Sequence, residues 1–140
     1  MMCQYVVGLA YTADGQSVLL IQKARPEWQA GFLNGVGGRI EEGEDIQAAM
    51  VREFEEETGI TTMVEQWSHF LTLKGEDYRI FFLSTMTDDV HSARRMTDEV
   101  PHIAPLRGLY LTQVLMDLQW IIPLSFFQTR IKIPVEITTR

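Results

Sequence analysis

The chain has 140 residues, of which 46% are hydrophobic and 22% charged, a balance that predicts a globular protein with a substantial core. Its formal net charge of −7 disfavours general nucleic-acid binding, because an acidic surface repels a polyphosphate backbone. Cys3 is the only cysteine, which excludes an internal disulfide and favours a reducing, cytoplasmic setting. The sequence contains no signal-like start and no apolar stretch long enough for a membrane span, so no membrane association is expected.

The first half of the chain predicts two strands, a loop and a helix. Residues 5–11 are apolar and β-prone, and residues 17–22 have the pattern of a buried strand. Residues 25–43 carry a proline and five glycines and predict a loop. Residues 45–58 contain neither glycine nor proline and are rich in helix formers, so they predict a helix that stops at Gly59.

The second half predicts a further helix and three more strands. Residues 64–73 and 78–86 have the pattern of paired strands, whereas residues 87–106 are polar and predict a loop. Residues 112–120 are a candidate second helix, and residues 131–137 a final strand at a sheet edge, since a proline lies within it. This mixture predicts an α/β sandwich with a mixed sheet.

The predicted helix over residues 45–58 places acidic side chains on a face that should be apolar. At 100° per residue, four apolar side chains form the stripe expected to face the core: Ile46, Ala49, Met50 and Phe54. Glu53 and Glu57 lie on this stripe and Glu56 borders it, so their spacing brings three carboxylates together. Glu55 points to the opposite side and is expected to be an ordinary solvated residue.

This carboxylate cluster predicts a cation site. Like charges at these spacings repel one another, and they lie near the negative end of the helix dipole. A sequence selected only for stability would place lysine or arginine there instead. Three carboxylates suit a hard, oxygen-binding cation such as Mg²⁺ or Mn²⁺ better than zinc.

The segment around this helix resembles the signature of the Nudix hydrolase family. Gly38 is followed by five residues and Glu44, and seven more lead to Arg52-Glu53-Phe54-Glu55-Glu56-Glu57-Thr58-Gly59-Ile60. This long gapped pattern is far more specific than a lone glycine-rich loop. The resemblance implies one Nudix domain over residues 1–140, folded as an α/β/α sandwich with a central mixed sheet, in which the signature forms a loop–helix–loop.

The same resemblance implies roles for individual residues. Residues that bind divalent metal, Mg²⁺ or alternatively Mn²⁺, are Glu53, Glu56 and Glu57. Glu44 supports this group and Arg52 orients its carboxylates, while Gly37 and Gly38 let the backbone approach a diphosphate, as their small size also suggests. A carboxylate must accept the proton of the attacking water. Glu53 is the candidate within the signature, and Glu99 is the candidate in a later loop.

Outside the signature, the sequence is similar to the MutT-like and oxidised-purine triphosphatase branch. Asn34 matches a base-contacting asparagine, and Asp117 matches an aspartate of the base pocket. A tryptophan and an extra acid of the mammalian members are replaced here by Leu115-Met116. Three basic residues flank the glycine-rich loop and are candidates to hold phosphate: Lys23, Arg25 and Arg39. Each tryptophan, Trp28, Trp67 or Trp120, is a candidate either for stacking on a base or for core packing.

These features predict a small nucleotide as the partner and a (d)NTP pyrophosphohydrolase, which releases nucleoside monophosphate and pyrophosphate. One alternative is a Nudix hydrolase of another diphosphate: a nucleotide sugar, dihydroneopterin triphosphate or capped RNA. A second alternative is a non-catalytic Nudix domain that senses a ligand or binds a protein. The sequence leaves open whether the protein is a monomer or a homodimer.

Overall fold

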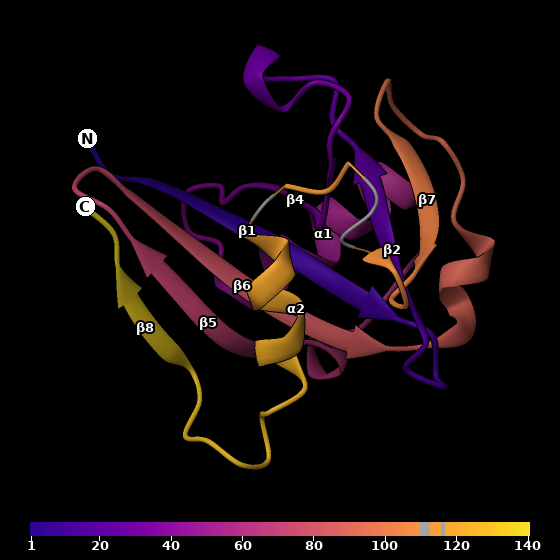
Figure 1. Ribbon diagram of the computed structural model, residues 1–140. Helices are drawn as coiled ribbons and strands as arrows, with labels where there is room; N and C mark the ends of the chain where they lie inside the picture. Colours follow the sequence, from indigo (N-terminus) through magenta and orange to yellow (C-terminus); the bar gives the residue numbers. More distant parts are fainter. Residues whose placement is uncertain (110–112, 116) are drawn as a thin grey trace.

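The computed structural model describes residues 1–109, 113–115 and 117–140. Within them, the strands form one sheet in the order β3-β2-β1-β6-β5-β8, with β4 paired to β1 and β7 to β2 (Figure 1). The strands are β1 (Cys3–Tyr11), β2 (Ser17–Gln22), β3 (Leu33–Asn34), β4 (Val36–Arg39), β5 (Ser68–Lys74), β6 (Tyr78–Met86), β7 (Val100–Pro105) and β8 (Val135–Thr138). The α-helices are α1 (Ile46–Thr58) and α2 (Leu118–Ser125), and the 3₁₀ helices are η1 (Glu27–Gln29), η2 (Val64–Gln66) and η3 (Asp88–Ser92).

The sheet is mixed and separates two hydrophobic cores. Its central strand β1 runs parallel to β6 and antiparallel to β2 and β4. Because successive side chains of a strand point to opposite faces, Val6 and Ala10 pack in the core that contains α1, whereas Leu9 and Tyr11 pack in the core that contains α2. The predicted α/β/α sandwich is therefore confirmed.

Helix α1 forms as predicted, with recognisable signals at both ends. Asp45 caps the N-terminus by accepting a hydrogen bond from Ala48 N at 2.8 Å. Gly59 ends the helix in the left-handed region, at φ 77°, where glycine pays no steric penalty. Three members of the predicted apolar stripe are fully buried and the fourth, Ile46, packs against the same core. Helix packing therefore fixes which way the acidic residues point.

The glycine-rich segment 25–43 is more ordered than the predicted loop, since it contains η1, β3 and β4. Strand β4 pairs with β1, and Gly37 lies opposite Val7. A Cβ at Gly37 would overlap the carbonyl oxygen of Val6. Glycine disfavours strands in general, so the pattern predicts a loop. At Gly37 the backbones of β4 and β1 approach so closely that only glycine fits.

The prediction for residues 87–120 is wrong in two places. The segment predicted as a polar loop contains η3 and also β7, which pairs with β2. Residues 113–115 are not helical, because Leu33 pairs with Val114 in a parallel bridge. Helix α2 begins only at Leu118 and continues through Pro123, a residue that disfavours helix interiors. Thr112 and Met116, at the start and middle of the predicted helix, lie outside the described residues.

The final strand and the molecular surface follow the sequence pattern. Strand β8 begins at Val135, later than predicted, and lies at the end of the strand order beside β5, which confirms its edge position.

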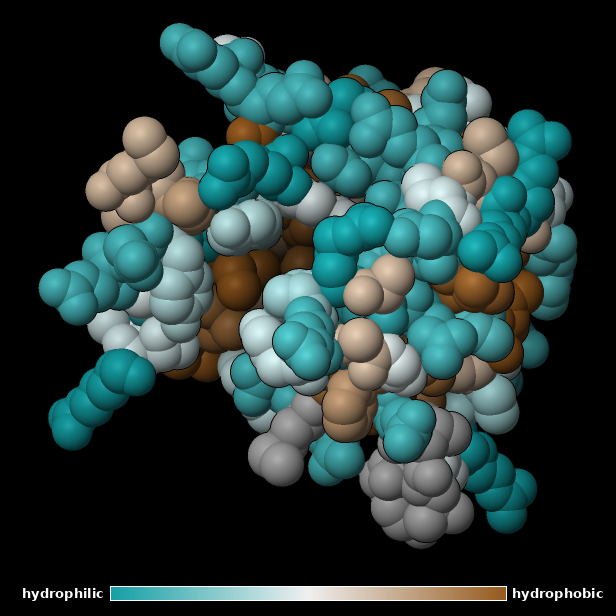
Figure 2. All heavy atoms as spheres, turned by 90° about the horizontal axis from the view of Figure 1, so that it is seen from above, coloured by the Kyte–Doolittle hydropathy of each residue, from teal (hydrophilic) through white to brown (hydrophobic). Residues whose placement is uncertain are grey.

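In the part of the chain that the structure describes, neither α-helix has the length and hydropathy of a membrane span. The face seen in Figure 2 is mostly hydrophilic, with hydrophobic groups recessed between polar ones.

Candidate active site

Arg52 lies at the centre of the acidic cluster on α1. Its Nε and Nη2 atoms donate to the two oxygens of Glu44 at 2.8 and 2.9 Å, a bidentate pair. Its Nη1 donates to Glu53 at 2.8 Å and to Glu56 at 3.3 Å. The carbonyl oxygen of Arg39 accepts a further bond from Nη2. Arg52 therefore links Glu44, at the start of the signature, to Glu53 and Glu56 on α1.

Glu53 is the buried member of the cluster, with 8% of its surface exposed. A Cβ at Gly38 would lie 2.5 Å from its carboxyl carbon, so the carboxylate occupies space that only glycine leaves open. Burial raises the pKa of Glu53, although the Arg52 hydrogen bond opposes this. The other carboxylate oxygen, Oε2, has no hydrogen-bond donor among the described residues. Glu53 is therefore held by one oxygen and available at the other.

Thr97 links Glu57 to the backbone of Glu99 by two hydrogen bonds. Thr97 Oγ1 donates to Glu57 Oε2 at 3.0 Å and accepts from the backbone N of Glu99 at 3.0 Å. Burial raises the pKa of Glu57, and the nearby charge of Glu99 adds to that rise. Glu99 is 5% exposed, and both its oxygens accept hydrogen bonds, from Lys23 Nζ at 3.1 Å and Ala24 N at 2.8 Å. The structure thus brings the distant Glu99 beside α1.

The chemistry of these side chains suits a hard divalent cation. The available donors are carboxylate oxygens, and the raised pKa values of Glu53 and Glu57 reflect buried acids that a cation would stabilise. Among the described residues, no group of three or more His, Cys, Asp or Glu residues is arranged to hold a metal ion. Arg52 donates hydrogen bonds to Glu53 and Glu56, and Thr97 donates one to Glu57. The three carboxylates must therefore rotate if they are to bind one cation together.

A cavity of about 250 Å³ brings together Asn34 and Asp117, which are far apart in the sequence. The backbone joins their segments, since Leu33 N donates to Gln113 O at 2.7 Å and Leu115 N donates to Leu33 O at 3.0 Å. The cavity has a buried apolar floor: Leu73, Phe82, Leu118 and Ile121. We call it the apolar pocket.

A smaller cavity of about 120 Å³, which we call the channel, lies beside the apolar pocket. It shares Asn34 with the apolar pocket, and Gly37, Gly38 and Lys23 also line it. Two lining residues of the channel contact the acidic residues, since Gly38 borders the Glu53 carboxylate and Lys23 pairs with Glu99. The apolar pocket, the channel and these carboxylates therefore lie next to one another.

Two basic residues predicted to bind phosphate lie elsewhere. The exposed Arg25 pairs with Asp98, and Arg39 donates to Cys3 Sγ at 3.3 Å while lying over the ring of Tyr5. Lys23 is the basic residue in the channel. Sequence reasoning missed Thr97 altogether, because a lone loop threonine carries no pattern. Glu55 is exposed, as predicted, and accepts a hydrogen bond from Thr61.

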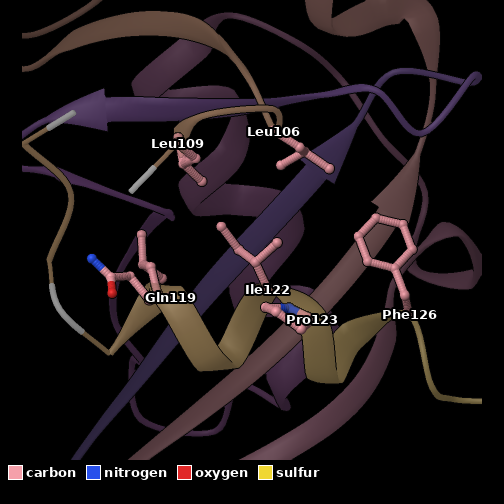
Figure 3. A pocket seen from close by; sticks show the side chains of 7 residues that line it. Leu106, Leu109, Gln119, Ile122, Pro123 and Phe126 are labelled. Carbon is pink, nitrogen blue, oxygen red and sulfur yellow. The ribbon is translucent and has the colours of Figure 1, made fainter. Parts of the chain in front are cut away.

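A further cavity of about 320 Å³ lies on another side of α2 (Figure 3). Its lining side chains are apolar apart from Gln119, and Leu118 is shared with the apolar pocket. Among the described residues it contains no acidic or basic side chain. It therefore lacks the groups that phosphate chemistry requires.

Comparison with known proteins bears on the fold and the family. A MutT structure described for Aliivibrio salmonicida and Vibrio cholerae is 22% identical, with a TM-score of 0.76 over 91% of this chain and 99% of that one. The NUDIX domain of Shewanella oneidensis NrtR, complexed with ADP ribose, is 16% identical, with a TM-score of 0.77 over 92% and 89%. A MutT protein from Bacillus halodurans is 19% identical, with a TM-score of 0.66 over 87% and 80%.

At such identities these likenesses show the fold alone. A search of the curated proteins found no match. The model of the NUDIX domain, however, matches residues 3–120, which include α1, the glycine-rich segment and Glu99. The chain therefore belongs to the NUDIX domain family.

Proposed function

We propose that this Nudix hydrolase cleaves nucleoside triphosphates to nucleoside monophosphate and pyrophosphate, with Mg²⁺ or Mn²⁺ as its cation. The observation that supports this most is that the apolar pocket, the channel and the acidic cluster lie next to one another in this order. A base, a phosphate chain and a cation can occupy these three places in the order in which a nucleotide carries them. The MutT fold relationship agrees with this assignment.

Glu53, Glu56 and Glu57 would hold the cation, with Arg52 and Glu44 positioning them. When bound, a divalent cation offsets the charge of the phosphates and makes a nearby water more acidic. Arg52 keeps the carboxylates close to one another despite their repulsion, because it donates to Glu53 and Glu56 at the same time. Gly38 leaves room both for the Glu53 carboxylate and for a diphosphate above the backbone.

Of the two candidate bases, the structure favours Glu53 over Glu99. Glu53 keeps Oε2 without a hydrogen-bond donor among the described residues, so this oxygen is free to accept a proton from water. Both oxygens of Glu99 already accept hydrogen bonds from Lys23 and Ala24. Glu99 is therefore better suited to holding Lys23 in the channel or to joining the cation site beside Glu57.

Asn34 and Asp117 would read the base at the apolar pocket. Asn34 Oδ1 accepts from Gly35 N at 2.7 Å, which leaves its amide N–H groups for an acceptor on the base. Asp117 Oδ1 accepts from Trp120 Nε1 at 3.2 Å, which leaves Oδ2 for a donor on the base. The pair therefore suits a base edge that carries both an acceptor and a donor.

A second candidate function has one observation in its favour. The similar NrtR domain was solved with ADP ribose, a nucleoside diphosphate joined to a second group. The apolar pocket and channel would also accept that class of substrate, which extends to nucleotide sugars. Retention of every signature carboxylate argues against the non-catalytic alternative.

A substrate panel separates these functions. We expect Mg²⁺-dependent release of pyrophosphate from at least one (d)NTP, measured beside ADP ribose, nucleotide sugars and dihydroneopterin triphosphate. Pyrophosphate must be distinguished from orthophosphate, because its release identifies cleavage of the bond between the α- and β-phosphates. Absence of turnover with every (d)NTP, together with turnover of another diphosphate, would refute the proposal in favour of the second candidate.

A further inference from the structure

The apolar pocket has room for a flat ring, but its buried residues cover only one face of such a ring. Its floor is aliphatic apart from Phe82, and Asn34 and Asp117 supply polar groups among the described residues that line it. Such a pocket provides one apolar surface and a polar margin, but a nucleobase has two faces to cover. Stacking on an aromatic side chain is the usual way in which proteins cover a base face.

The structure separates the three tryptophans by role. Trp67 is 4% exposed, packs edge-on against Phe54 and donates to Thr62, so it belongs to the core. Trp120 is 39% exposed, and its indole N–H positions Asp117. Trp28 is 70% exposed although it lines the apolar pocket. Among the described residues, its side chain makes no hydrogen bond or ring contact.

Trp28 is held at the pocket by a closed excursion between β2 and β3. Lys23 N donates to Phe32 O and Gly31 N donates to Lys23 O, both at 2.8 Å, which closes the base of the excursion. Within it, η1 carries Trp28, and Arg25 joins the excursion to Asp98 before β7. In Figure 1 this excursion stands out from the sheet at the top of the view. These hydrogen bonds and the ion pair therefore hold the segment that carries the exposed Trp28 indole.

We infer that Trp28 is the stacking residue for the base of the substrate and closes the apolar pocket over it. The inference rests on the proposed function. A base between the indole and the aliphatic floor would present its edge to Asn34 and Asp117, which come from the two walls joined by the Leu33 backbone bonds. A purine offers more ring area than a pyrimidine, so Trp28 should favour purine nucleotides.

Binding of α,β-methylene (d)NTP analogues in the presence of Mg²⁺ tests this inference without hydrolysis. Indole fluorescence of the wild-type protein should change on binding, and iodide should quench it less at saturation. Trp28→Phe should bind with similar affinity but lose most of the fluorescence change, since phenylalanine still stacks. Trp28→Ala should lose about ten-fold in affinity for purine analogues and less for pyrimidine analogues. Trp67→Phe, a change in the core away from the apolar pocket, is the matched control and should retain the fluorescence change.

The outcomes distinguish this inference from the proposed function. Trp28→Ala affinities within about two-fold of wild type, or a fluorescence change that survives in Trp28→Phe, would overturn the stacking role. If the wild type hydrolyses (d)NTPs while Trp28→Ala has an unchanged KM, the inference fails and the proposed function stands. If no (d)NTP is hydrolysed but the analogues alter Trp28 fluorescence as expected, the inference stands and the proposed function fails.

Discussion

At the scale of single residues, the site depends on two adjacent glycines with different tasks. A side chain at Gly37 would collide with the β1 backbone, whereas one at Gly38 would displace the Glu53 carboxylate. Gly37 therefore allows β4 to pair with β1, and Gly38 leaves space for the Glu53 carboxylate. The sequence predicts that both allow close backbone approach, but only the paired strands show what approaches each of them.

These two glycines predict opposite phenotypes. Gly37→Ala should lower the free energy of unfolding by about 1–3 kcal/mol, because β1 and β4 must separate. Gly38→Ala should change stability less but reduce kcat by roughly 10–100-fold, because Glu53 moves from its position. Urea denaturation and turnover measured on both variants check this. Equal stability losses with equal turnover in the two variants would contradict the assignment.

At the scale of elements, prediction succeeded where periodicity and capping agree. Helix α1 has an apolar stripe, an aspartate cap and a terminal glycine, so its bounds and its inward-facing acids were predictable. Strands β2 and β6 have the predicted bounds for the same reason, since their patterns are unambiguous. The polar strand β7 was missed and the proline-containing α2 was predicted too early in the chain, because long-range pairing and packing determine them.

One element gives a prediction that is independent of the active site. His69 lies at an irregularity of β5, where its Nε2 is 2.8 Å from Thr72 Oγ1. Burial lowers its pKa below the ordinary value of 6.5. Between that value and the lower folded-state pKa, the unfolded chain binds more protons than the folded protein. The contribution of His69 to stability is therefore present above 6.5 and is lost as the pH falls.

Free energies of unfolding at about pH 7.5 and about pH 5.5 measure this effect. The wild-type protein should lose more stability between these values than His69→Gln, which cannot titrate there. His91→Gln is the control, since His91 is exposed, and it should behave like the wild type. Identical losses in wild type and His69→Gln would show that His69 is not responsible.

At the scale of the whole molecule, the sheet assembles a site from segments that no local pattern connects. Glu99 reaches α1 because β7 pairs with β2, and Asp117 reaches Asn34 because residues 113–115 run beside Leu33. The sequence singled out the carboxylates and, by resemblance, proposed Asn34 and Asp117 as base-contacting residues, which the structure places at one cavity. It did not predict the channel, the position of Lys23 or the exposure of Trp28, because these depend on long-range pairing.

We expect the inward-facing acids of α1 to carry out metal-dependent cleavage of a phosphoanhydride. Glu57→Gln and Glu55→Gln, two isosteric changes on opposite sides of one helix, test this by pyrophosphate release with Mg²⁺ and with EDTA. Glu57→Gln should lose about 100-fold or more, since altering even the outer partners of a bound metal costs 10–100-fold. Glu55→Gln should stay within about two-fold, as expected for a surface change, and EDTA should abolish wild-type turnover. Undiminished turnover by Glu57→Gln, or by the wild type in EDTA, would contradict the account.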